Sequence, residues 1–154
     1  MKHTSTIFDR FLHSFRELFI YHHDSLEFRA KIYTLPIVVN IDNGDCELEK
    51  LDDIVEEIYP ESLMRQNALI LTVKEYIHKV KQPNGLGIDE LIFDIERIIK
   101  RESRFVNKIN LIHIDMIASC TTEKESIIYQ KRVSSYLERL KNQYLKNRNI
   151  PTSG

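Results

Sequence analysis

The chain has 154 residues, of which 42% are hydrophobic and 29% charged, with a formal net charge of −1. This composition is ordinary for a folded protein and argues against a disordered chain. No run approaches the roughly 18 to 20 uncharged apolar residues that a membrane span requires. Charged residues interrupt the apolar positions of the N-terminus, so we do not expect a signal peptide. We therefore expect one cytoplasmic domain over residues 1–148, followed by a frayed tail over residues 149–154.

Apolar residues recur at helical spacing in the N-terminal half, and no alternating strand pattern accompanies them. A broad aromatic stripe predicts a first helix over residues 7–19. A second helix begins at Asp24, and Pro36 is expected to kink it or to split it at Leu35 because proline lacks an N–H donor. A third helix follows and ends at Pro60.

The same spacing continues to the end of the chain. A fourth helix ends at the turn Pro83-Asn84-Gly85, and a fifth begins near Ile88. A sixth helix is expected over residues 105–117, with Ile112 among its inward positions. The segment Thr122-Glu123-Lys124-Glu125 is a capping box that starts a seventh. The fold class is therefore all-α, a single compact bundle of about seven helices.

Two stretches of the chain suggest an internal duplication. A shift of 77 residues places the apolar helix over 31–40 on a similar helix over 108–118, although the register slips beyond the turns. Cys46 and Cys120 both fall in the turns that follow these helices. If the duplication is real, both turns emerge on one side of the bundle and the two thiols could meet as a soft-metal or redox pair. Two cysteines alone give no disulfide framework, and isolated thiols are more often inert.

The first of these turns is rich in carboxylates. Asp42, Asp45, Glu47 and Glu49 occupy eight residues at the start of a helix. Hard cations such as Ca²⁺ and Mg²⁺ prefer oxygen ligands, so these acids could hold a divalent cation, although the spacing is not that of an EF-hand. The alternative is that they only cap the helix, since acids at a helix N-terminus are stabilising. Any cation site would be centred on Asp42 and Asp45.

An apolar helix, an acidic glycine-containing turn and an amphipathic helix, occurring twice in about 150 residues, resemble the TerB family. That family is associated with tellurite resistance and is related to the N-terminal domain of the co-chaperone DjlA. The resemblance covers roughly residues 28–140 and implies a seven-helix fold and a composite divalent-cation site. Glu123 and Glu125 would be the donors from the second turn. Here Ser119-Cys120-Thr121-Thr122 replaces the expected acidic turn, which implies weak affinity.

Other motifs carry less. His22-His23-Asp24 ends a helix, where imidazoles favour the helix dipole, and His113 is expected to be a satisfied, partly buried histidine. The sequence has no nucleophile elbow, P-loop or dinucleotide fingerprint, so we do not expect an enzyme. The basic C-terminal half alternates bases with core positions and exposes no stacking aromatics. This is typical of a solvated helix face rather than a nucleic-acid surface.

These observations favour a non-enzymatic, cytoplasmic binding module, and the TerB resemblance would add a role in stress response. Such a module would bind a divalent cation or a protein partner through its acidic turn. The alternative is a pure interaction or scaffold domain without a metal, in which the acidic face of one copy meets the basic face of another.

Overall fold

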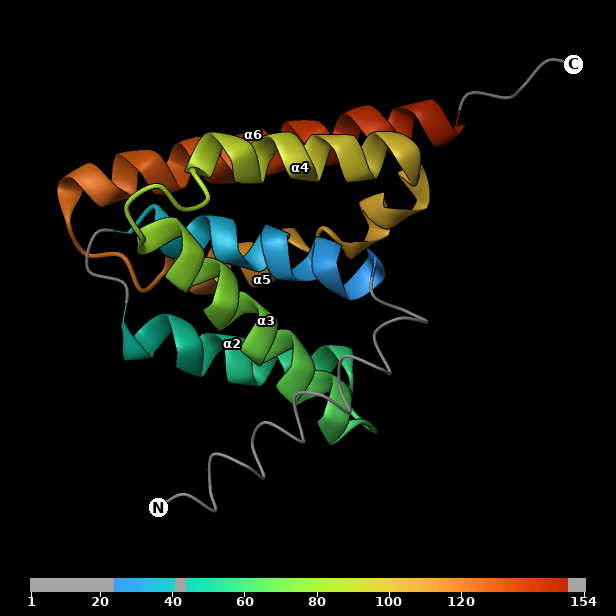
Figure 1. Cartoon of the computed structure of the whole chain (residues 1–154). Coiled ribbons are helices and arrows are strands. Elements are labelled where there is room, and N and C mark those ends of the chain that lie inside the picture. The colour runs from blue at the N-terminus through green and yellow to red at the C-terminus, as the bar shows by residue number, and fades with distance from the viewer. Residues whose placement is uncertain (1–23, 41–43, 150–154) are drawn as a thin grey trace, which may run out of the picture.

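The computed structural model describes residues 24–40 and 44–149 (Figure 1). Every regular element in these residues is a helix, which confirms the expected all-α bundle. A helix over residues 24–38 is followed by α2 (Asp45–Ile58), α3 (Leu63–Lys81), α4 (Ile88–Arg101), the 3-10 helix η1 (Ser103–Lys108), α5 (Leu111–Ala118) and α6 (Lys124–Asn149). The expected helix over residues 7–19 lies outside the described residues, as does the tail after Asn149.

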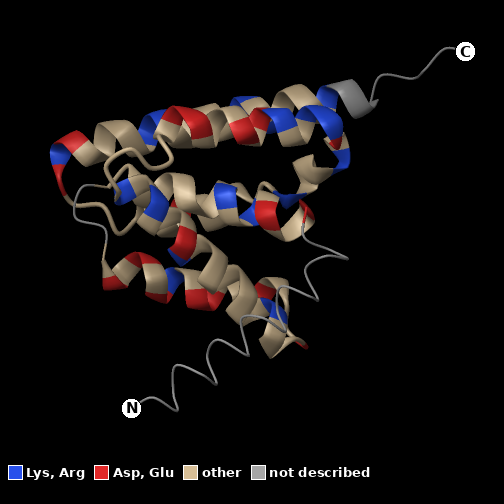
Figure 2. Ribbon diagram, in the orientation of Figure 1, with Lys and Arg blue, Asp and Glu red and all other residues tan. Residues whose placement is uncertain are grey.

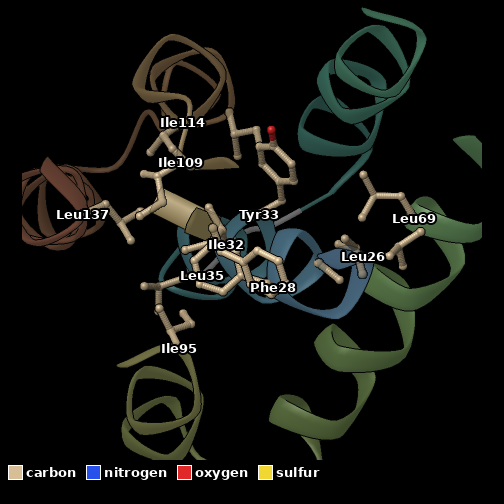
Figure 3. Close-up of a cluster of buried hydrophobic side chains, with 14 of the residues drawn as sticks. Leu26, Phe28, Ile32, Tyr33, Leu35, Leu69, Ile95, Ile109, Ile114 and Leu137 are labelled. Atoms are coloured by element: carbon tan, nitrogen blue, oxygen red, sulfur yellow. The ribbon is translucent and has the colours of Figure 1, made fainter. Parts of the chain in front are cut away.

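The 24–38 helix is the central helix of the bundle. In Figure 1 it lies, together with α5, between a layer formed by α4 and α6 on one side and α2 on the other, and α3 crosses obliquely from the level of α2 to that of the central helix. Residues 30–37 are all buried, as is typical of a helix surrounded by others. Figure 3 shows Phe28, Ile32 and Leu35 of this helix among apolar side chains of its neighbours. Those neighbours include Leu69 of α3, Ile95 of α4 and Leu137 of α6.

One charged side chain of the central helix is buried. Lys31 is 8% exposed, and its Nζ lies 3.6 Å from Oδ2 of Asp94 on α4. The same Nζ lies 5.5 Å from the centre of the Tyr76 ring on α3. A buried cation needs such partners because desolvation without compensation is costly. Lys31 therefore ties the central helix to α4 and to α3.

The sequence predicts helix breaks at two proline-containing segments, and the structure shows only one of them. The central helix is not split at Leu35 but continues through Pro36 to residue 38, and the Pro36 carbonyl accepts a hydrogen bond from Nε2 of Gln130 on α6. The turn after α3 forms as expected. Asn84 has a φ of 62°, and a Cβ added at Gly85 would lie 2.0 Å from the Lys79 carbonyl oxygen, so the close approach at this turn requires glycine.

The expected sixth helix is wrong as a continuous element. It is divided into η1 and α5, because Asn110 caps α5 by accepting hydrogen bonds from the backbone N–H groups of Ile112 and His113, at 3.0 and 3.3 Å. The interruption changes which residues face the core. Ile112, expected to point inward, is 72% exposed. Within the described part of the chain, no helix is long and apolar enough to cross a membrane.

Candidate functional site

The acidic turn is arranged as a helix cap. Glu47 is 2% exposed, and its Oε2 accepts the Gly44 backbone N–H at 2.9 Å. Its Oε1 accepts Nδ2 of the buried Asn40 at 2.5 Å. Both carboxylate oxygens thus hold the chain at the point where it enters α2. Asp45 and Glu49, by contrast, are exposed.

Within residues 24–40 and 44–149, the remaining acids of the expected cation site are not gathered around Glu47. Asp42 lies outside the described residues. Glu125 is exposed in the first turn of α6, and Glu123, also exposed, has an interaction of its own. Among the described residues, no three His, Cys, Asp or Glu side chains lie close enough together to hold a metal ion. The visible arrangement therefore favours capping for Glu47.

The two turns do meet, on one side of the bundle. Cys46 and Cys120 form a disulfide with a Cα–Cα distance of 5.8 Å across 74 residues of sequence. The expectation of inert, unpaired thiols was wrong, and the expectation that both turns emerge on the same side is confirmed. Cys46 is exposed in the first turn of α2, and Cys120 is half-buried. Whether the chain is duplicated stays a prediction.

His113 joins three helices, as expected of a satisfied core histidine. The ring is 3% exposed, and its Nδ1 lies 3.0 Å from the Tyr33 hydroxyl of the central helix. Its Nε2 lies 3.1 Å from Oε2 of Glu57 on α2. Burial raises the pKa of Tyr33 above its ordinary value. Tyr33 is also 1% exposed, so the hydroxyl and the ring are both buried and tie the helices together, whereas the Glu57 side chain is 67% exposed.

A groove between α4 and α6 is a second candidate, which the sequence analysis did not identify. We call it the basic groove; it has a volume of about 590 Å³ and a lining that is largely apolar. Its lining residues are Leu35, Ile92, Ile128, Lys131, Arg132, Val133, Ser135, Tyr136 and Arg139. Leu35 belongs to the central helix and Ile92 to α4, while the other seven belong to α6.

Three exposed bases border the basic groove: Lys131, Arg132 and Arg139. Within the described residues, no carboxylate forms an ion pair with any of them. Ile128, which also lines the groove, is 53% exposed. An apolar hollow bordered by cations that have no carboxylate partner among the described residues is suited to a ligand that carries both apolar and negatively charged groups.

The sequence signal for the basic groove is the spacing of its α6 residues. Ile128, Arg132, Ser135 and Arg139 follow one another at intervals of four, three and four, which places them on one helix face. The bases were interpreted as part of a solvated helix face. The sequence does not show that α4 lies beside this face of α6, and it is the packing of α4 against α6 that forms the groove.

A surface of opposite character lies where α2 meets α3. Leu63 and Met64 begin α3 and are 70% and 48% exposed; we call this pair the apolar corner. From Asp45 to Glu61 the preceding residues include eight acids and one base, Lys50. The corner is held in place, because Ser62 Oγ accepts the Arg65 N–H at 3.2 Å and Gln66 Nε2 donates to the Tyr59 carbonyl at 2.7 Å.

Comparisons with known proteins do not add to this description: no family model, curated protein or solved structure matches the chain. The TerB resemblance therefore stays a hypothesis that rests on the motifs of the two turns.

Proposed function

We propose that this chain is a non-enzymatic interaction module that associates with further copies of itself, with the apolar corner of one copy seated in the basic groove of the next. The observation that carries the proposal is the basic groove, an apolar hollow bordered by three cations that lack a carboxylate partner among the described residues. The occupant it calls for must supply apolar side chains and negative charge together.

The apolar corner meets this requirement on the same chain. Leu63 and Met64 provide exposed apolar surface, and Glu56 and Glu61, both exposed, stand close to them in sequence. Figure 2 shows acidic residues concentrated along α2, whereas many of the basic residues lie on α6 in the opposite layer. Complementary charge of this kind steers association and selects the partner surface.

The corner and the groove are different surfaces, so the contact is heterologous. Each copy could use its corner with one neighbour and its groove with another, which yields a ring or an open chain of copies rather than a closed two-fold dimer. Stable interfaces involve about 20 to 30 residues on each side, whereas nine residues line the groove. We therefore expect weak, concentration-dependent association that falls as salt screens the charges.

The binding of Ca²⁺ or Mg²⁺ through the acidic turn is the weaker hypothesis, because both oxygens of Glu47 are engaged by Asn40 and Gly44. A role in tellurite resistance rests on the family resemblance alone. The proposed cytoplasmic location also has a consequence for the disulfide. Disulfides persist mainly in oxidising compartments, so a cytoplasmic chain would hold its cysteine pair reduced or reversibly oxidised.

Sedimentation velocity over a range of protein concentrations tests the proposal. The weight-average sedimentation coefficient should rise with concentration in low salt and fall on addition of salt. Lys131→Glu with Arg139→Glu should abolish the rise, whereas Lys74→Glu with Lys124→Glu, an equal change of charge at exposed positions outside the groove, should preserve it. A chain that sediments as a monomer at all concentrations in low salt would overturn the proposal.

A further inference from the structure

A second hollow, separate from the basic groove, lies between the start of the central helix and η1. It has a volume of about 380 Å³, and we call it the cationic pocket. Its lining residues are Ser25, Arg29, Arg104, Phe105, Asn107 and Lys108. Three of the six carry positive charge and none carries negative charge. This composition differs from that of the basic groove, whose lining is largely apolar.

Aromatic packing brings the three cations together. The rings of Phe28 and Phe105 lie 5.6 Å apart, which fixes η1 against the central helix. Arg104 Cζ and Lys108 Nζ each lie 5.6 Å from the centre of the Phe105 ring, so both cations are held beside the same buried side chain. The fold thus presents two bases of η1 at the wall of one pocket.

Arg29 enters the pocket from the central helix and is also fixed. Its Nη1 donates to the Tyr59 hydroxyl at 2.9 Å, and its Cζ lies 5.3 Å from the centre of the Tyr59 ring. A guanidinium has five N–H donors, so this contact leaves most of them for a ligand. An oriented arginine loses less freedom on binding than a mobile one.

The charges of the pocket are only partly neutralised by the protein. Arg104 Nε lies 3.1 Å from Oε2 of Glu102, but in the described residues no carboxylate forms an ion pair with Arg29 or Lys108. Burial, together with the positive charges of Arg29 and Arg104, lowers the pKa of Lys108. Like charges gathered in this way are unfavourable unless an anion joins them.

We propose that the cationic pocket binds a phosphate group. A phosphate monoester carries nearly two negative charges and three strong acceptor oxygens, which suits two guanidinium groups and an ammonium. The Ser25 hydroxyl and the Asn107 amide add neutral donors at the same wall. The pocket is also roomy enough for part of the group that carries the phosphate. That group is either a small soluble ester or the headgroup of a lipid.

Isothermal titration calorimetry with glycerol 3-phosphate, at constant ionic strength set with NaCl, tests the site. We expect saturable binding to the wild-type chain and to Lys74→Gln, which removes a base that does not line the pocket. The dissociation constant should rise at least tenfold in Lys108→Gln. Arg104→Gln should give the same loss and is the safer variant, because its side chain is 71% exposed and contributes little to the core. Circular dichroism of each variant confirms that its helix content is unchanged.

Co-flotation with vesicles separates the two sources of phosphate. Phosphatidylcholine vesicles with and without phosphatidic acid are compared, because phosphatidic acid supplies a phosphomonoester headgroup. Flotation that needs phosphatidic acid and is lost in Arg104→Gln assigns the site to a lipid, whereas binding of glycerol 3-phosphate without flotation assigns it to a soluble ester. The proposal is overturned if neither probe binds, or if both bind Arg104→Gln as tightly as the wild-type chain.

Discussion

The acidic edge of the molecule, formed by α2, and the basic face of α6 look alike as runs of charge in the sequence but differ in what their charges contact. On α2, Glu47 closes the helix entrance and Glu57 reaches the ring of the buried His113. On α6, Lys131 and Arg139 border a groove and form no ion pair with any described residue. A run of charged residues therefore has a structural role only where its side chains contact other residues of the fold. Charged side chains without such contacts are available to a partner.

The disulfide gives the largest expected effect, and it belongs to the acidic edge. Replacing Cys46→Ser and Cys120→Ser should lower the free energy of unfolding by about 4 kcal/mol, because the bond closes a loop of some 75 residues in the unfolded chain. Urea unfolding of the oxidised wild-type chain and of the double variant measures the difference. Equal stability of the two would mean that the turns are held together by packing alone.

The next effect separates capping from exposed charge within the acidic edge. Glu47→Ala should cost about 2 kcal/mol, because the buried Asn40 amide and the Gly44 N–H lose their acceptor. Glu49→Ala removes an exposed acid two residues further along α2 and should change stability by less than about 0.5 kcal/mol. Thermal melts of both variants measure the two losses of stability. Similar losses would show that the hydrogen bonds of Glu47 do not stabilise the fold more than an exposed acid does.

Removing charges from the basic face of α6, unlike removing Glu47, should leave the stability of the fold almost unchanged. Lys131→Gln with Arg139→Gln should change the free energy of unfolding by less than about 0.5 kcal/mol per site, since both side chains are exposed and neither forms an ion pair with a described residue. Urea unfolding at a dilution where the chain is monomeric provides the measurement. A large loss would assign these bases a role in the fold and remove the reason to propose a partner for them.

The smallest effect concerns the cation hypothesis. If the carboxylates of the first turn act only as caps, millimolar Ca²⁺ or Mg²⁺ should leave the melting temperature unchanged. A cation present at one hundred times its dissociation constant would instead add about 2.7 kcal/mol to the folded state. A shift that disappears in Asp42→Asn with Asp45→Asn would restore the acidic turn as a metal site.

Helix positions could be predicted where breakers and caps mark them. Pro60, the turn at Gly85 and the capping box before Lys124 all end or begin a helix near the expected residue. The division of the sixth helix could not be predicted from apolar spacing, because Asn110 interrupts a stripe whose apolar residues continue on both sides. Only the hydrogen bonds of its side chain to α5 reveal the cap.

The candidate sites were less accessible to sequence reasoning than the helices. The acidic turn is compact in sequence and was found, whereas the basic groove depends on the juxtaposition of α4 and α6. The cationic pocket combines Arg29 with residues about 75 positions later, which are brought together by the contact of two phenylalanine rings. Sites built from distant segments need the packing of the core before their members can be identified.

Mixing two complementary variants tests the central claim most directly. Leu63→Asp with Met64→Asp removes the apolar corner but keeps the basic groove, and Lys131→Glu with Arg139→Glu does the reverse. Each variant alone should sediment as a monomer. Mixed in equal amounts at low salt, they should form a one-to-one dimer that grows no further, because one intact corner and one intact groove remain. A mixture that stays monomeric, while the wild-type chain associates, would contradict head-to-tail pairing of these two surfaces.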